Sequence, residues 1–269
     1  YSFLNTIRIR PEDSNALNML GVAFFKKGNI KSSISYYSKA IELNPQNDNI
    51  YNNLAIAYSK SGNLEAAVSI YLKALKIDSN SFSTLFNLGR IYQQKGDLEK
   101  ALETFEKILK LKNVNSLDLV FNEIGITLQK KEDFHSAIKA YLKAIKINKN
   151  SIQSYNNLGY AQFEMEDFDS ATSSFLKAIK LNPKNAIARK NLSKIFLLKG
   201  NYKEGLKNYE YRYEHSNIRI LPHASPNIPI WSGEDSERPD KLLVISEQGL
   251  GDTLQFMRFL PLLRKKDQK

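Results

Sequence analysis

The sequence predicts an all-α fold, a right-handed α-solenoid of about six helix-turn-helix repeats. A small residue that follows Leu or Ile returns at intervals of 34, 34, 36, 34 and 34 residues, at Gly21, Ala55, Gly89, Gly125, Gly159 and Ser193. A second small residue recurs at Ser33, Ala67, Ala101, Ala137, Ala171 and Gly205. An aromatic residue follows each of these four positions later, at Tyr37, Tyr71, Phe105, Tyr141, Phe175 and Tyr209. One such hairpin cannot bury its own apolar face, so the copies are expected to stack.

The repeat at 152–185 shows the pattern most completely. Gly159 stands where a partner helix has to cross closely, and Phe175 fills the gap between turns of the two helices. Small side chains are expected at the helix contact, and a proline ends the second helix; these residues are Ala171, Ala178 and Pro183. The unit is therefore expected to be a pair of short amphipathic helices with a defined stop.

Turn signals fall between the two helices of several repeats. Gly28, Gly62, Gly96 and Gly200 are each followed by Asn or Asp. Glycine supplies a left-handed helix stop, and Asn or Asp caps the helix that follows. The third repeat carries two extra residues around 112–116, which should lengthen one loop.

These signals divide the chain into a repeat region, a linker and a final segment. The repeat region is 1–215, with a partial repeat at 1–13 followed by repeats at 14–47, 48–81, 82–117, 118–151, 152–185 and 186–215. The linker is 216–240, where Pro222, Pro226, Pro229 and Pro239 exclude a continuous helix and Trp231 is the expected anchor. The final segment, 241–269, is expected to be the first strand and helix of an incomplete α/β domain.

Bulk composition excludes several classes of protein. The 269 residues include no cysteine, so disulfides and thiolate metal sites are excluded, and we expect neither a metal nor a cofactor. No apolar run approaches the ~20 residues needed to span a bilayer, and we expect a cytoplasmic location. The net charge is +11, but most of the excess is single lysines at recurring outward positions, such as Lys73 and Lys143. We treat these as a solvated face, and nucleic-acid binding is only a third, weaker reading.

The six registers resemble the tetratricopeptide repeat from Tyr1 to about His215. This resemblance implies a protein-interaction module whose first helices line a concave groove. Two residues before each small crossing residue, the side chain should point into that groove. The occupants are Met19, Asn53, Asn87, Glu123, Asn157 and Asn191.

A row of asparagines can bracket the backbone amides of an extended peptide whatever its sequence, because each side chain both donates and accepts. The row resembles that of O-linked N-acetylglucosamine transferases, with breaks at Met19 and Glu123. The alternative is structural, with each asparagine bonding a neighbouring turn. We expect Asn53, Asn87, Asn157, Asn191 and Glu123 to line a peptide-binding groove.

A second candidate site lies in the glycine loop at 247–253. Gly249 and Gly251 allow a ligand to approach the backbone, and with Thr253 they stand at a helix N-terminus that favours an anion. The stretch from Pro229 to Lys265 resembles the junction in bacterial tetratricopeptide proteins that carry a glycosyltransferase-like domain with two Rossmann halves. The Gly251-Asp252 pair is similar to one in heptosyltransferases, which implies Asp252 as general base; the alternative is that Asp252 only caps a helix.

The sequence thus predicts a module that binds an extended peptide and recruits substrate for a glycosyltransferase-like protein. The alternative is a plain scaffold with no enzymatic role. We expect no transferase activity from these residues alone, and a nucleotide-sugar partner only for a complete parent protein.

Overall fold

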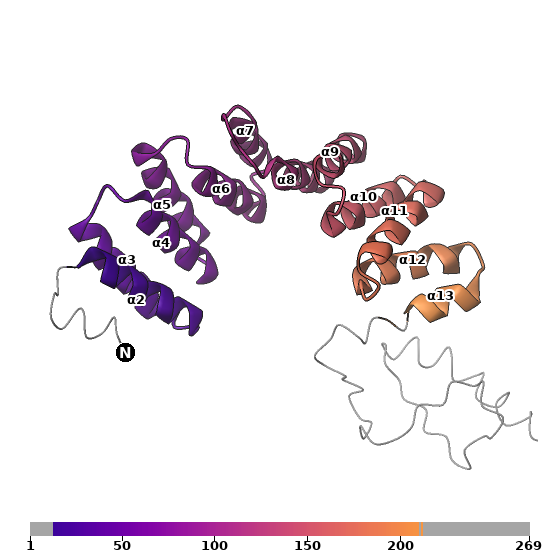
Figure 1. Ribbon diagram of the computed structural model, residues 1–269, viewed down its shortest axis with the longest axis horizontal. Helices are drawn as coiled ribbons and strands as arrows, with labels where there is room; N and C mark the ends of the chain where they lie inside the picture. The colour runs from indigo at the N-terminus through magenta and orange to yellow at the C-terminus, as the bar shows by residue number, and fades with distance from the viewer. Residues whose placement is uncertain (1–12, 210, 212–269) are drawn as a thin grey trace, which may run out of the picture. The chain divides into compact units, whose positions relative to one another are not determined.

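The computed structural model describes residues 13–209 and residue 211, which form twelve α-helices and no strand (Figure 1). The helices are α2 (Ser14–Lys26), α3 (Ile30–Leu43), α4 (Asp48–Lys60), α5 (Leu64–Ile77), α6 (Phe82–Lys95), α7 (Leu98–Leu109), α8 (Leu117–Lys130), α9 (Phe134–Ile147), α10 (Ile152–Glu164), α11 (Phe168–Leu181), α12 (Ala186–Leu198) and α13 (Tyr202–Tyr209). The all-α solenoid predicted from the repeats is confirmed over this range. None of the described helices combines the length and apolar character that crossing a membrane requires.

The helices form six hairpins that follow one another in chain order (Figure 1). We call the first helix of each hairpin, α2 to α12 in even numbers, the A helix, and the second, α3 to α13 in odd numbers, the B helix. Each helix packs against the next one in the chain, and each A helix also packs against the A helix of the next hairpin. The A helices therefore make a continuous layer, and side chains on it can be linked from repeat to repeat.

Four of the hairpins close on a glycine that faces an aromatic ring, at Gly21, Gly89, Gly125 and Gly159. A Cβ atom built on Gly125 would lie 2.4 Å from a ring carbon of Tyr141, and one on Gly159 would lie 2.7 Å from a ring carbon of Phe175. Both rings are fully buried. The 34-residue recurrence of small residues thus reflects the space that the buried ring of the B helix occupies against its A helix.

The turns inside the hairpins follow the capping rules. Asn63, Asp133 and Asp167 each accept a hydrogen bond from the backbone N–H three residues later, which caps the B helix that follows. The residue before each cap is left-handed, and two of these residues are not glycine: φ is 62° at Glu132 and 59° at Glu166.

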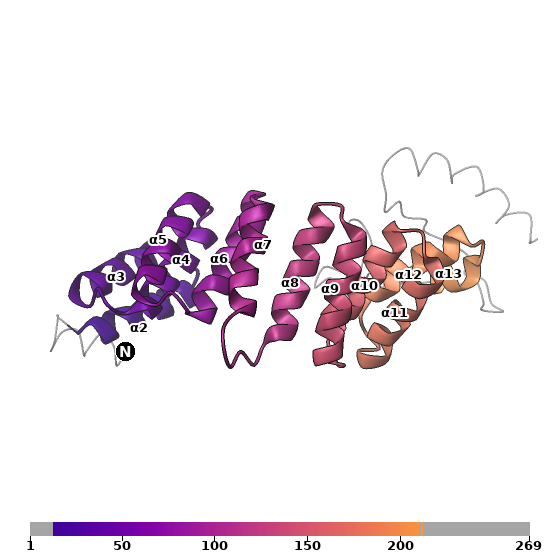
Figure 2. The ribbon, with the colours of Figure 1, turned by 90° about the horizontal axis from the view of Figure 1, so that it is seen from above.

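The α7–α8 connection differs from the others. Helix α7 ends at Leu109 after 12 residues, and the loop that follows runs to Ser116 before α8 begins (Figure 2). Asn113 in this loop has a φ of 59°. The two extra residues of the third repeat are accommodated here.

Several sequence-based expectations fall outside the described residues. They are residues 1–12 of the partial first repeat, the proline-rich linker at 216–240, the strand at 241–246, the glycine loop with Gly249, Gly251, Asp252 and Thr253, and the helix expected at 253–265.

Candidate functional site

The predicted asparagine row lies on the A-helix layer, and three of its members bond to the preceding repeat. We call the residues two positions before each crossing residue the ladder residues. A side-chain N–H donates to the carbonyl oxygen of an asparagine one repeat earlier from Asn53 to Asn18 (3.1 Å), Asn87 to Asn52 (3.2 Å) and Asn157 to Asn122 (3.0 Å). Each bond joins two consecutive A helices, so the row contributes to cohesion of the stack.

These bonds use only part of the hydrogen-bonding capacity of each ladder asparagine. An Asn side chain carries two N–H donors and one carbonyl acceptor, and the cross-repeat bond takes one donor. Asn53, Asn87 and Asn157 are half-buried, and no other hydrogen bond of their side chains is found in the described part of the chain. Each retains an N–H and a carbonyl oxygen, the pair of groups that a peptide backbone complements.

The two ends of the row differ from its middle. Met19, the first ladder residue, has no amide and is 42% exposed. Asn191, the last, is half-buried, but its expected acceptor Asn156 takes a hydrogen bond from Asn185 instead (3.2 Å). The regular amide pairing therefore extends from α2 to α10, with an interruption at α8.

The interruption replaces both partners of one pair. Phe86 stands where the acceptor asparagine would be, and Glu123 stands where the donor would be, so no amide bond can form. The Glu123 carboxylate lies 3.9 Å from Nε of Arg90 instead. Burial raises the pKa of Glu123, and the positive charge of Arg90 opposes that shift.

Polar side chains fill the space around Glu123. The side-chain amide of Gln93 donates to the backbone oxygen of Glu123 (3.0 Å) and to the hydroxyl of Thr127 (2.7 Å), and Lys130 donates to the backbone oxygen of Gln93 (3.2 Å). Helices α6 and α8 are thus linked by a charged and polar cluster where other A helices are linked by an amide pair.

Sequence reasoning found the ladder residues but missed their acceptors. The residue before each ladder position forms a second row, with Asn18, Asn52, Asn122 and Asn156 as its asparagines. The available signal was the Asn-Asn dipeptide at 52–53 and at 156–157. With two adjacent asparagines in one repeat, the second can donate a hydrogen bond to the preceding repeat while the first accepts one from the following repeat.

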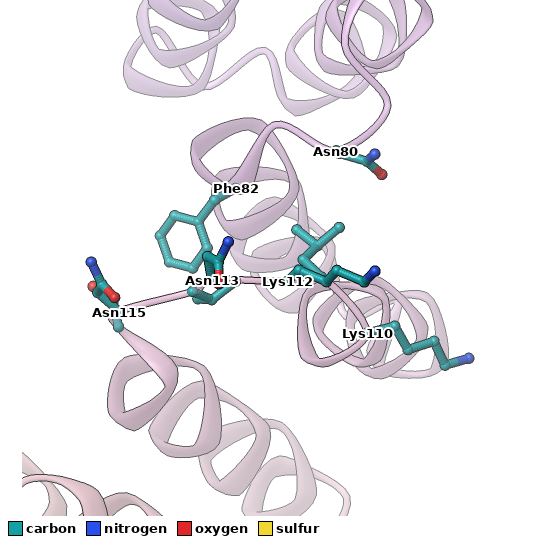
Figure 3. Close-up of a pocket in the computed structure, with 9 residues that line it drawn as sticks. Asn80, Phe82, Lys110, Lys112, Asn113 and Asn115 are labelled. Atoms are coloured by element: carbon teal, nitrogen blue, oxygen red, sulfur yellow. The ribbon is translucent and has the colours of Figure 1, made fainter.

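A pocket of about 550 Å³ opens at the same junction between repeats (Figure 3). Its apolar lining residues are Phe82, Leu111 and Val114, and the other residues that line it are Asn80, Lys110, Lys112, Asn113, Asn115 and Ser116. Figure 3 shows Asn113 beside the ring of Phe82, while Lys110 extends away from it. The pocket is a product of the long α7–α8 loop, because that loop supplies most of its wall.

The described residues hold no cluster of His, Asp or Glu suited to a metal ion. The candidate base Asp252 and the ligand loop of Gly249, Gly251 and Thr253 lie outside them.

Comparison with protein families matches the repeat region several times. Models described as tetratricopeptide repeat match residues 46–113 and 152–185, and a model described as TPR repeat matches 21–62 and 125–166. Comparison with curated protein sequences gives no match.

Solved structures give the same fold. The chain is similar to YrrB, described as "a TPR protein with an unusual peptide-binding site", at 26% identity and a TM-score of 0.51 over 69% of this chain and 94% of that one. It is similar to MamA at 25% identity and a TM-score of 0.53, over 60% of this chain and 93% of that one. PilF of Pseudomonas aeruginosa, at 17% identity and a TM-score of 0.65 over 78% and 93%, shows the fold alone.

The family matches together cover more than half of the 269 residues, and they fall on the hairpins whose crossing residues and buried rings recur every 34 residues. The chain belongs to the tetratricopeptide repeat family.

Proposed function

We propose that the A-helix layer binds an extended segment of another protein, with the ladder asparagines contacting its backbone. The observation that carries the proposal is that Asn53, Asn87 and Asn157, while held by their cross-repeat bonds, each keep an amide N–H and a carbonyl oxygen that the described part of the stack does not use. Each bond fixes the orientation of its side chain and leaves one donor and the acceptor for a ligand. An amide whose rotamer is already fixed loses less conformational entropy on binding, so the row is preorganised.

The likeness to YrrB supports this proposal, because that protein is described as having a peptide-binding site. Where an extended peptide adds to a sheet edge, main-chain hydrogen bonds supply affinity and side-chain pockets supply specificity. A surface whose recurring polar group is an amide can make the same main-chain hydrogen bonds, since it matches any peptide backbone.

A plain scaffold without a peptide site is the second candidate. The amide bonds themselves favour it, because they give the asparagines a role within the stack. The two candidates predict different peptide affinities when the same hydrogen bonds are removed by replacing either the donor or the acceptor asparagines.

Two double variants separate them. Asn87→Ala with Asn157→Ala removes the ladder side chains, whereas Asn52→Ala with Asn122→Ala removes the acceptors of the same two bonds and leaves the ladder in place. Probes are fluorescent peptides of one length, built from Ser, Gly and Thr with Glu, Lys or Gln at regular intervals, and binding is followed by anisotropy. Each lost hydrogen bond is worth about 0.5–1.5 kcal/mol, so we expect the ladder double variant to bind about tenfold more weakly than the wild type.

The acceptor double variant should lower the melting temperature at least as much as the ladder double variant, because Asn122 is buried and also accepts a hydrogen bond from the Ser154 hydroxyl, but it should bind at least severalfold better. Equal affinity of the two variants would leave the asparagines with a purely structural role. Binding of none of the three peptides by the wild-type protein would contradict the peptide site.

We also propose, from the sequence at 229–265, that the repeats recruit protein substrate for a glycosyltransferase-like domain in the complete protein. The support is the Gly251-Asp252 pair after a predicted strand. In the complete protein, Asp252→Asn should abolish sugar transfer and leave donor affinity intact. Unchanged turnover would remove Asp252 from catalysis.

A further inference from the structure

The charges on the ladder side of the A helices are unevenly distributed. Positions +7, +3 and −1 lie about 20°, 60° and 100° to the same side of a ladder residue around the helix axis, because an α-helix turns once in 3.6 residues. Those positions, together with the ladder residues themselves, define the ladder face. Its cations are Lys26, Lys60, Arg90, Lys130, Lys190 and Lys194, and its carboxylates are Glu123 and Glu164.

Each of the two carboxylates on the ladder face has a polar or charged neighbour on the same face. Glu123 is buried beside Arg90, and Glu164 lies close enough to Tyr160 to raise the pKa of the tyrosine hydroxyl. The cations are more accessible: the five lysines are exposed, and the Arg90 side chain is 59% exposed. Among the described residues, Arg90 alone of the six cations has a carboxylate within 4.0 Å.

Three acidic residues outside the ladder face pair with lysines that are also outside it. Glu65, Glu99 and Asp169 begin B helices and pair with Lys95, Lys131 and Lys199 of the following hairpin, at 2.6, 2.8 and 2.6 Å. These pairs lie at the turns between A and B helices, and none of their six residues belongs to the ladder face. The positive charge of the ladder face is therefore left largely uncompensated by the protein itself.

The pocket at the α7–α8 loop is also lined by lysines. Lys110 and Lys112 line it, and no acidic residue does. It lies at the N-terminal ends of α6 and α8, whereas Lys130 is the last residue of α8, so it is a second basic site separate from the ladder-face cations.

We infer that the segment bound along the ladder face is acidic, an extended stretch with Asp or Glu at intervals and no matching run of Lys or Arg. The inference rests on the proposed peptide site and names its partner class. The amides would hold the backbone of the segment, and the exposed cations would select the sign of its side chains. Exposed charges of this kind set specificity and association rate more than they set total affinity.

The test uses the Glu, Lys and Gln peptides and two triple variants with the same change in net charge. Lys26→Gln, Lys60→Gln and Lys194→Gln neutralise three cations of the ladder face. Lys73→Gln, Lys107→Gln and Lys177→Gln neutralise three exposed lysines on B helices. Circular dichroism melting checks that both variants fold like the wild type.

We expect the Glu peptide to bind about tenfold more tightly than the Gln peptide, and the Lys peptide to bind least. Exposed charge pairs contribute roughly 0.2–1 kcal/mol each, so the ladder-face triple should lose about tenfold in affinity for the Glu peptide. The B-helix triple, whose lysines would not contact the peptide, should lose less than about threefold. The advantage of the Glu peptide should shrink as salt is raised.

Equal binding of the Glu and Gln peptides would overturn the inference while leaving the peptide site standing. Equal losses in the two triple variants would overturn it too, because net charge alone would then explain the effect. A single-stranded oligothymidylate that binds more tightly than the Glu peptide, and that the ladder-face triple releases, would assign the cations to nucleic acid instead.

Discussion

The side-chain nitrogen of Asn157 lies 3.0 Å from the side-chain oxygen of Asn122, in the preceding repeat, and donates a hydrogen bond to it. The residues on which we base ligand recognition are therefore also residues that hold neighbouring A helices together. Changes at the ladder should alter stability and binding at once, and the two effects have to be measured separately.

Replacing Asn157 with Asp tests the direction of this bond. An ionised carboxylate cannot donate, so it would face the oxygen of Asn122 with no hydrogen between them. We expect Asn157→Asp to melt at a lower temperature than Asn157→Ala at neutral pH, with a cost of about 1–3 kcal/mol relative to the wild type. A melting temperature equal to that of the wild type would show that the amide bond is dispensable.

Glu123 predicts a pH-dependent stability of defined sign. Burial raises the pKa of this carboxyl above its ordinary 4.5. As pH rises through the raised value, the native state has to hold a charge that burial disfavours, so stability is lost. Glu123→Gln should therefore unfold at higher denaturant concentration than the wild type at neutral pH, and the difference should vanish below about 4.5.

Glu99 provides the opposite case as a control. Its hydrogen bond with Lys131 lowers the pKa of Glu99, so the ionised form favours the native state. Glu99→Gln should lower stability at neutral pH, and that loss should disappear as pH falls below the ordinary carboxyl value. A pH profile with the same sign for both variants would contradict the assignment at Glu123.

The turns at Glu132 and Glu166 are strained positions that glycine would relieve. Their φ values of 62° and 59° are left-handed, where four other hairpins have Gly28, Gly62, Gly96 and Gly200. Left-handed backbone costs a non-glycine residue about 1–2 kcal/mol. We expect Glu132→Gly and Glu166→Gly each to stabilise the protein by about 1 kcal/mol in urea unfolding, whereas Gly96→Ala should destabilise it.

The crossing at Gly125 should not accept a larger residue without movement of the ring. A Cβ there would lie 2.4 Å from Tyr141, which is fully buried. We expect Gly125→Ala to cost about 1–3 kcal/mol. The same substitution should cost less in a Tyr141→Leu background, and a double-mutant cycle in urea measures this coupling; additive effects would show that the close contact is not what limits the site.

The solenoid could be predicted from sequence because every repeat places a small residue on its A helix and an aromatic residue on its B helix at the same interval. Gly159 and Phe175 are separated by a fixed interval, and that interval alone indicates a helix crossing. The ladder residues followed from the same register. Their acceptors did not, because a hydrogen bond between Asn157 and Asn122 depends on how two A helices are placed side by side, which a single repeat does not encode.

The junction at α7–α8 shows the same limit. The sequence indicated an insertion near 112–116 and a break at Glu123, but it did not connect them. Arg90 was not singled out, since its only relation to Glu123 is spatial. The glycine loop around Asp252 remains a prediction from sequence.

The central claim is that a ligand lies along the ladder asparagines, and their side-chain amide resonances report on it directly. In protein labelled with nitrogen-15 at asparagine, addition of the Glu peptide should shift the side-chain signals of Asn53, Asn87 and Asn157, assigned through Asn→Gln variants. The signals of Asn29 and Asn63, which cap B helices, should stay in place. Saturable binding that shifts the capping asparagines and leaves the three ladder amides unmoved would contradict the account.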